Sequence, residues 1–279
     1  MLVQARPQLL ESFKFVPHAQ TGNCSGLFRC HPDTQIWELV HSLVVEKCLR
    51  EQYAGVTGLT PEERDYIQST RGIHLLHSEF MRNTYDPCFA EKLDANLDVF
   101  PLANGVVDMR TREFRATRAD NHVRLHAGWS YDADAAREHR DDVEGFWAQL
   151  LPVEEERRVF LTYVAGLLSG RRAIKKMIVL TDRQAGNNGK STAVNMLRAF
   201  FGGLSKTNNR LLNKSAFERD RDAHDAGFAS FRGVRVTLLE ELKRTMRFDE
   251  GLVKLLTGGA GVSVEGRHCG SADTYRFVW

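Results

Sequence analysis

Apolar positions in the first third of the chain predict helices. From Ile36 to Leu49 the apolar residues recur every three or four positions, which is the spacing of one face of an amphipathic helix. A second helix is predicted after Thr60, because Pro61 suits the first helical position and Glu63 completes a capping box. We therefore expect the N-terminal third to be mainly helical.

The pattern changes between Leu97 and Asp132. In this stretch β-branched and aromatic residues alternate with polar ones, and the pair Asn104-Gly105 is a turn signal. Alternation with a period of two places every second side chain on the same face, as in a strand. The stretch therefore predicts short antiparallel strands.

Helical spacing returns from about Asp141. The run EEERRVFLTYVAGLLSGRR, residues 154–172, has acids at its start, a stop signal at Gly170 and arginines just beyond it. Acids at the first turn and basic residues after the last complement the helix dipole. We expect a domain boundary between Gly170 and Lys175.

Beyond this boundary, strand and helix patterns alternate. KKMIVL, residues 175–180, is a β-rich run, KSTAVNMLRAFFGG, residues 190–203, has helical spacing, and GVRVTLL, residues 233–239, is a second β-rich run. A short helix is predicted from Asp249 to Gly258. This alternation favours a three-layer α/β nucleotide-binding core.

Composition sets wide limits. A chain of 279 residues that is 42% hydrophobic can bury the core of one or two domains, and a net charge of +2 neither demands nor excludes a nucleic-acid partner. The five cysteines lack the paired spacing of a zinc site and indicate a reducing compartment. Because no apolar run approaches the roughly 20 residues of a membrane span, we expect a soluble intracellular protein.

The stretch QAGNNGKST, residues 184–192, comes close to the phosphate-loop pattern GxxxxGK[ST], although Gln184 replaces the first glycine. A glycine-containing loop between a strand and a helix lets backbone N–H groups point at phosphate. Lys190 is placed to contact the β- and γ-phosphates of ATP, and the Ser191 hydroxyl to bind Mg²⁺. The alternative is a polar turn that contains GKST by chance.

Two acids end the second β-rich run. A carboxylate at the end of such a strand can hold Mg²⁺, and its neighbour can activate the attacking water. Glu240 and Glu241 stand at this position, with Glu240 as the metal candidate. With the loop, they predict hydrolysis of a nucleoside triphosphate, with Lys190, Glu240 and Glu241 as catalytic residues.

These residues resemble the superfamily 3 helicase region of the primase-helicases of large DNA viruses, phages and related plasmids. Three stretches match the family pattern in order: LDANLDVFPLANGVVDMRTREFR (93–115), FRGVRVTLLEE (231–241) and the Lys-x-Leu-Thr-Gly-Gly element at 254–259. The phosphate loop of the family matches Gly186, Asn187, Asn188, Gly189, Lys190, Ser191 and Thr192, which are our candidate ATP contacts.

The resemblance implies an α/β fold with an AAA+-like P-loop ATPase core of three α/β/α layers, preceded by a mainly helical domain with a short antiparallel β segment. The expected divisions are an extension at 1–35, a helical and β-hairpin domain at 36–172, and the ATPase core at 173–279. That core is expected to be truncated before the sensor strand, so neither the sensor asparagine nor the arginine finger is assigned.

The family implies a replicative DNA helicase that uses ATP and Mg²⁺. Its implied partners are single-stranded or forked DNA, further copies in a homo-hexamer, and replication proteins such as a primase, in a viral or phage setting. By analogy Arg267 contacts DNA in a channel hairpin, with Lys254 and His268 as weaker candidates. Two alternatives stay open: a non-catalytic nucleotide- or DNA-binding remnant, and a P-loop kinase.

Overall fold

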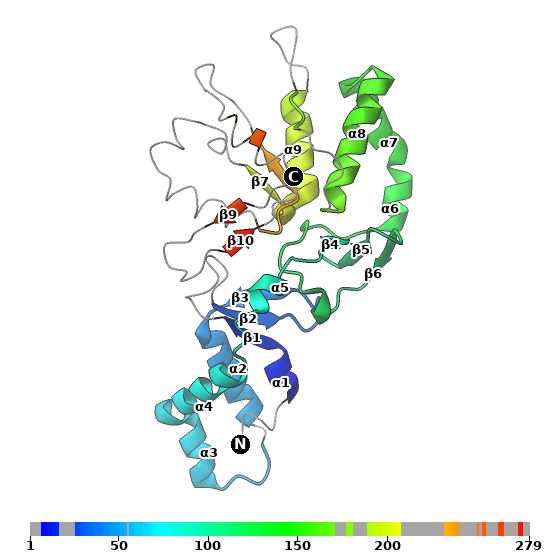
Figure 1. The fold of residues 1–279 in the computed structure, drawn as a ribbon. Coiled ribbons are helices and arrows are strands. Elements are labelled where there is room, and N and C mark those ends of the chain that lie inside the picture. Colours follow the sequence, from blue (N-terminus) through cyan, green and yellow to red (C-terminus); the bar gives the residue numbers. More distant parts are fainter. Residues whose placement is uncertain are drawn as a thin grey trace.

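The computed structural model describes residues 7–16, 26–54, 56–170, 177–180, 189–207, 232–239, 250, 253–254, 262–264 and 273–275. In Figure 1 the helices of an N-terminal lobe lie at one end and α7, α8 and α9 lie at the other. Two small antiparallel sheets lie between these ends. Helices and small sheets therefore alternate along the described chain.

The N-terminal lobe, residues 7–83, combines helices with a three-stranded antiparallel sheet in the order β1-β2-β3. Its elements are α1 (Pro7–Glu11), β1 (Phe13–Val16), β2 (Gly26–Cys30), β3 (Trp37–Val40), α2 (Ser42–Ala54), α3 (Pro61–Gln68) and α4 (Thr70–Asn83). Its largest core cluster of buried residues contains Phe13, Leu27, Val45, Leu49, Tyr53, Ile67, Ile73 and Phe80.

The predicted helix from Ile36 to Leu49 is wrong in its first part. Trp37–Val40 is strand β3, antiparallel to β2, and the helix begins at Ser42. Apolar residues at 36, 37 and 40 fit a helical face, but pairing with β2 satisfies the backbone in the extended form. The Trp37 N–H also donates to the Val123 carbonyl at 2.7 Å, a long-range bond that local spacing cannot reveal.

The predicted start of α3 is confirmed. Thr60 is the N-cap, and its hydroxyl oxygen accepts the Glu63 N–H at 3.2 Å. The Glu63 carboxylate accepts the Thr60 N–H at 2.9 Å, and Pro61 occupies the first helical position. The capping box is therefore complete.

The predicted antiparallel strands are confirmed between residues 99 and 115. The strands β4 (Val99–Leu102), β5 (Gly105–Asp108) and β6 (Glu113–Arg115) pair in that order, and the turn containing Asn104 joins the first two. Beyond β6 the expected strands are absent over the described residues 116–132, which contain the short 3-10 helix η3 (Ala119–Asn121) instead. The helix α5 (Phe89–Lys92) precedes this sheet.

Three helices follow: α6 (Ala133–Glu138), α7 (Arg140–Leu150) and α8 (Glu154–Leu168). The predictions of helix from about Asp141 and of an acidic first turn in the next helix are confirmed, since α8 begins with three glutamates. Gly170 follows α8 with φ +55°, a conformation that glycine adopts without strain. It is therefore a suitable stop residue.

The C-terminal part contains α9 (Lys190–Phe201), the 3-10 helix η4 (Gly202–Leu204), β7 (Ser205–Thr207) and β8 (Val236–Leu238). β7 and β8 pair in parallel, with Ser205 opposite Val236. The strand expected at 175–180 is not found in its described part, 177–180, although Ile178 and Leu180 pack against the core. Two further strands, β9 (Val262–Val264) and β10 (Asp273–Tyr275), pair antiparallel.

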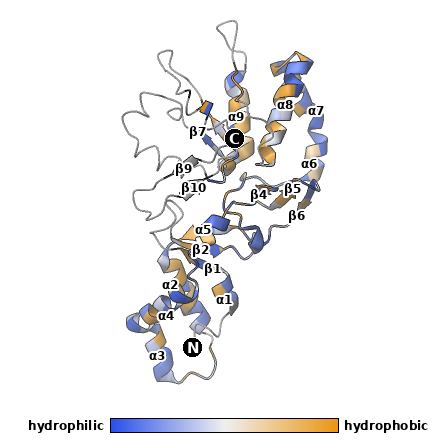
Figure 2. Cartoon of the chain, viewed as in Figure 1, coloured by the Kyte–Doolittle hydropathy of each residue, from blue (hydrophilic) through white to orange (hydrophobic). Residues whose placement is uncertain are grey.

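The largest core cluster joins both sides of the boundary that we predicted near Gly170 to Lys175. Before the boundary it includes Phe100, Leu102, Ala127, Trp147 and Phe160, and beyond it Ala193, Leu197, Phe201, Leu204, Val236 and Leu238. Figure 2 shows apolar positions on α8 and α9, two helices that contribute to this cluster. We call it the shared core.

Candidate nucleotide-binding site

The helix α9 begins where the sequence predicts a phosphate loop to end. Its N-cap is Gly189, with φ +79° and ψ 5°, and Lys190 is its first residue. The Ala193 N–H donates to the Gly189 carbonyl at 2.9 Å, which closes the first turn. Because the first turn of a helix carries a partial positive charge, it can attract an anion.

Backbone conformation favours glycine at position 189. Its positive φ is unfavourable for a residue with a side chain. A Cβ at this position would also stand 2.6 Å from the Leu150 Cδ1 atom, at the end of α7. Since α7 lies before the predicted boundary, the helical region preceding the core contacts the end of the phosphate-loop stretch.

One face of α9 holds the candidate residues in place. Ala193, Leu197 and Phe201 are buried in the shared core, and α9 packs against both β7 and β8. Lys190 is half-buried at the first turn, whereas Ser191 and Thr192 are exposed. The buried face therefore fixes the helix while its first turn keeps partial access to solvent.

The connection from α9 to β7 sets the direction of the site. Only η4 separates the helix from the strand against which it packs, so the helix and the parallel strands run in opposite directions (Figure 1). The N-terminus of α9 is therefore at the edge where β7 and β8 end. Ligands of open α/β sheets bind at this carboxyl edge.

The structure places some of the predicted site residues. Gly189, Lys190, Ser191 and Thr192 lie together at the start of α9, and Lys254 is exposed at a helical position. The other candidates lie outside the described residues: Gly186, Asn187, Asn188, Glu240, Glu241, Arg267 and His268.

Arg235, directly before β8, makes long-range hydrogen bonds that the sequence pattern did not reveal. Its side chain is buried, and its Nη2 atom donates to the carbonyls of Asn96 at 3.3 Å and Val99 at 3.0 Å. Its backbone N–H donates to the Leu204 carbonyl at 2.7 Å. A Cβ on Gly170 would stand 1.1 Å from its Nη1 atom, so the guanidinium also lies against the end of α8.

Charge and burial act against each other at Arg235. Burial lowers the pKa of its guanidinium to about 10, while the nearby carboxylates of Asp94 and Asp98 oppose this shift. The side chain therefore remains a cation at neutral pH. The sequence signal was an arginine within the otherwise apolar run GVRVTLL.

Asp94, in the motif LDANLD, connects three segments. One carboxylate oxygen accepts the N–H groups of Arg124 at 2.7 Å and Leu125 at 2.8 Å, and the other accepts Arg124 Nε at 3.2 Å. A Cβ on Gly233 would stand 2.6 Å from the Asp94 Cβ, so the residues before β8 touch it directly. Burial raises the pKa of Asp94, and Arg124 is the main opposing influence.

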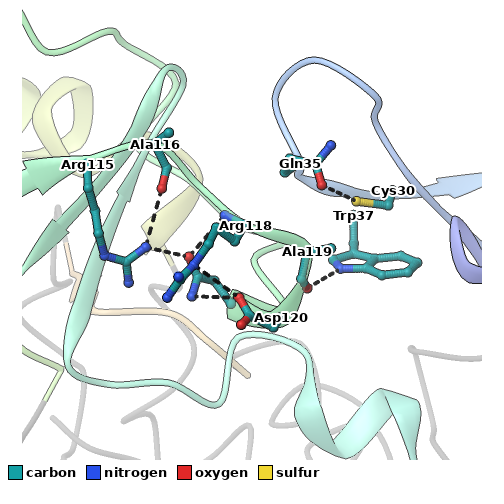
Figure 3. Close-up of polar contacts among 9 residues, drawn as sticks. Cys30, Gln35, Trp37, Arg115, Ala116, Arg118, Ala119 and Asp120 are labelled. Carbon is teal, nitrogen blue, oxygen red and sulfur yellow. Dashed lines mark hydrogen bonds and ion pairs between the residues drawn. The ribbon is translucent and has the colours of Figure 1, made fainter.

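Arg115, the last residue of the 93–115 stretch, contacts the residues after β6. Arg115 Nη1 donates to Asn121 Oδ1 at 2.9 Å and to the Ala116 carbonyl at 3.3 Å (Figure 3). Beside it, the Trp37 indole donates to the Ala119 carbonyl at 3.0 Å, which links β3 to η3. The described contacts of Arg115 and Asp94 therefore give the 93–115 stretch a structural role.

Residues 28–152 match the family model described as D5 N terminal like. The matched stretch begins in β2 and ends just after α7, so it contains the 93–115 motif and stops before α9. This finding supports the resemblance to viral primase-helicases for the N-terminal part of the chain. No curated protein matches the chain.

The described residues contain neither a membrane-spanning helix nor a cluster of metal ligands. None of the helices they form combines the length and apolar character that crossing a membrane requires. No group of three or more histidine, cysteine, aspartate or glutamate side chains in the same part of the chain is arranged to hold a metal ion.

Proposed function

We propose that the chain is an ATP-dependent replicative DNA helicase of the superfamily 3 type, or the N-terminal part of one, which couples ATP hydrolysis to DNA unwinding. The observation that carries the proposal is the start of α9. A left-handed glycine leads into Lys190 and Ser191 at the edge where two parallel strands end. The match of residues 28–152 adds independent support, because it lies outside this site.

Each candidate residue has a defined task in this proposal. Backbone N–H groups of the loop from Gly186 bind the phosphates of ATP, and the Lys190 ammonium neutralises the β- and γ-phosphates. Ser191 and Glu240 hold Mg²⁺, which when bound offsets the charge that develops on the transferred phosphoryl group. Glu241 orients and deprotonates the attacking water.

The start of α9 fits these ligands. A helix N-terminus preceded by glycine supplies the partial positive charge that a phosphate group requires. A hydroxyl and a carboxylate are oxygen ligands, the type that Mg²⁺ prefers. The four described candidates, residues 189–192, are contiguous, so the first turn of α9 sets their positions relative to one another.

DNA and further copies of the chain are the proposed partners. In a homo-hexamer the basic candidates Arg267, Lys254 and His268 would contact the phosphate backbone of single-stranded or forked DNA in the central channel. Replication proteins such as a primase would work beside it. The match to the D5-type N-terminal region favours such a replication setting.

The test is ATP hydrolysis by Lys190→Ala protein with and without single-stranded DNA, measured beside the particle mass by light scattering. We expect the wild type to form a ring-sized particle and to hydrolyse ATP faster with DNA. The substitution should lower kcat by about a hundredfold or more, because it removes a charge that stabilises the transition state.

The matched control is Lys47→Ala. Lys47 is an exposed lysine on α2 with 78% of its side chain accessible, and it should keep full activity. Thermal unfolding of both variants checks that the fold is retained. Unchanged hydrolysis in Lys190→Ala protein would refute the assignment, and nucleotide binding without hydrolysis in the wild type would identify a non-catalytic nucleotide-binding module.

A further inference from the structure

The buried guanidinium of Arg235 has a structural cost that its neighbours do not have. Val236 and Leu238, the buried residues of β8 itself, are apolar and belong to the shared core. Burying a cation is unfavourable unless hydrogen bonds and opposite charges compensate, and an apolar side chain at such a site often gives equal or greater stability. Arg235 therefore needs an explanation other than core packing.

Contacts of Arg235 with three different segments hold the start of β8 in place. The side chain holds the strand to the Asn96 and Val99 carbonyls, the backbone holds it to Leu204, and the guanidinium fills the space beside Gly170. Gly233 packs against Asp94 on the same side. The beginning of β8 is thus held on the loop from Asp94 to Val99.

The strand itself has few other contacts that define its register. Among the described residues β8 pairs with β7 over three positions, from Ser205 opposite Val236 to Thr207 opposite Leu238. A short parallel pair can slip, and a slip moves every following residue. Glu240 and Glu241 follow Leu239 directly in the sequence, and a displacement of the strand start changes where Leu239 lies.

We propose that Arg235 is a positioning residue for nucleotide hydrolysis. By holding the start of β8 on the loop from Asp94 to Val99, it fixes the carboxyl end of β8, which the candidate acids Glu240 and Glu241 follow in the sequence, relative to the N-terminus of α9. This inference rests on the proposed function. It makes hydrolysis depend on the region that matches the D5-type model, through a residue that touches neither nucleotide nor metal.

The test compares Arg235→Met, Arg235→Lys and the control Arg137→Met. Arg137 is an exposed arginine on α6 that pairs with Asp134 at 2.9 Å, so its replacement removes the same charge at the surface. Three quantities are measured: ATP affinity without Mg²⁺, kcat per bound nucleotide, and the Mg²⁺ concentration that gives half the maximal rate. Counting bound nucleotide corrects for unfolded protein.

We expect Arg235→Met to lower kcat per bound nucleotide by about tenfold to a hundredfold and to raise the Mg²⁺ requirement severalfold, as for groups that orient metal ligands. ATP affinity without Mg²⁺ should change by less than about twofold, because the loop residues supply that binding. Arg235→Lys should recover part of the loss, since it restores the charge but not the fork of donors. Arg137→Met should resemble the wild type.

Each remaining outcome decides against the inference. An Arg235→Met protein with unchanged kcat per bound nucleotide and unchanged Mg²⁺ requirement overturns it, even though the helicase proposal survives. Equal losses of nucleotide binding and rate, with normal turnover per bound site, would assign Arg235 a structural role only. A wild type that hydrolyses no ATP overturns both proposals together.

A measurement on the wild type tests the same inference without any substitution, so it can be made even if the variants do not fold. Amide hydrogen exchange is followed over residues 94–99 with and without Mg²⁺ and a non-hydrolysable ATP analogue. If Arg235 links this loop to the site, the ligands should slow exchange there. Ligand binding that protects α9 but leaves residues 94–99 unchanged would overturn the inference.

Discussion

The N-terminal lobe and the shared core differ in how the chain builds them. The core cluster of the lobe runs from Phe13 to Phe80, so its residues come from one contiguous stretch. The shared core runs from Phe100 to Leu238 and combines α9, η4 and β8 with the strands β4 and β5 and the helices α7 and α8. The first core is local in sequence, and the second is not.

This difference shows that a change in sequence pattern need not mark the border between two parts that unfold independently. The boundary that we predicted near Gly170 to Lys175 marks a change in pattern, yet apolar residues from both sides pack together. Trp129 shows the contact in detail, because its indole N–H donates to the Phe200 carbonyl at 2.7 Å. We therefore expect the α9–β8 part to lose structure together with the hairpin region before it.

The largest expected effect comes from two phenylalanines that are both 0% exposed, Phe201 in the shared core and Phe80 in the lobe. Alanine at either position should lower the free energy of unfolding by about 3–5 kcal/mol, through lost burial and the cavity left behind. Phe201→Ala should speed amide exchange in α9 and also in β4, where Phe100 packs on Phe201. Denaturant unfolding and hydrogen exchange measure both effects.

Phe80→Ala is the matched control for this comparison. Phe80 packs edge-on against Phe13, with ring centroids 5.2 Å apart, so its loss should speed exchange in the lobe. The shared core should keep its protection. If Phe201→Ala left exchange in β4 unchanged, the two sides of the predicted boundary would be independent units.

A smaller effect is expected from Gly202→Ala. Gly202 has φ +48°, and a Cβ there would stand 1.9 Å from the Ala127 carbonyl oxygen, so alanine must displace backbone. We expect a loss of about 2 kcal/mol or more in unfolding free energy, from strain and overpacking. Thermal and denaturant unfolding give the value.

The control is Gly145→Ala on α7, where a Cβ would meet no atom within 4 Å. Because alanine favours helix over glycine, this change should stabilise the protein by up to about 1 kcal/mol. The two glycine substitutions should thus have opposite signs. Equal effects would mean that the contact between η4 and Ala127 does not hold the shared core together.

Features encoded by neighbouring residues were predictable from the sequence. The capping box at Thr60, the turn at Asn104 and the acidic start of α8 each depend on a few adjacent positions, and the structure has all three. The start of α9 at Lys190 belongs to the same class, since a glycine followed by a helical pattern defines it. The start of α9, the local part of the candidate site, could therefore be predicted from the sequence.

Features that depend on distant partners were not predictable. The Trp37–Val40 segment forms a strand because β2 and the Val123 carbonyl provide partners, and neither leaves a mark on its own spacing. Arg235 binds carbonyls 139 and 136 positions earlier in the chain. No local pattern records such a contact, so an arginine in an apolar run was the only signal.

The smallest expected effect is confined to the lobe. Thr60→Ala removes the hydroxyl that accepts the Glu63 N–H at the start of α3. A lost N-cap costs about 1 kcal/mol, because a backbone N–H then has no partner within the protein. Hydrogen exchange should therefore become faster in α3 and its neighbours in the lobe, while α9 and β4 keep their rates.

Ser78→Ala supplies the control within the same lobe. Its hydroxyl donates to the His74 carbonyl, one turn earlier in α4, and alanine is a better helix former than serine, so this change should leave exchange in α3 unaltered. Faster exchange in α9 after Thr60→Ala would contradict the distinction between the two cores, because a helix cap in the lobe would then govern the stability of the candidate site.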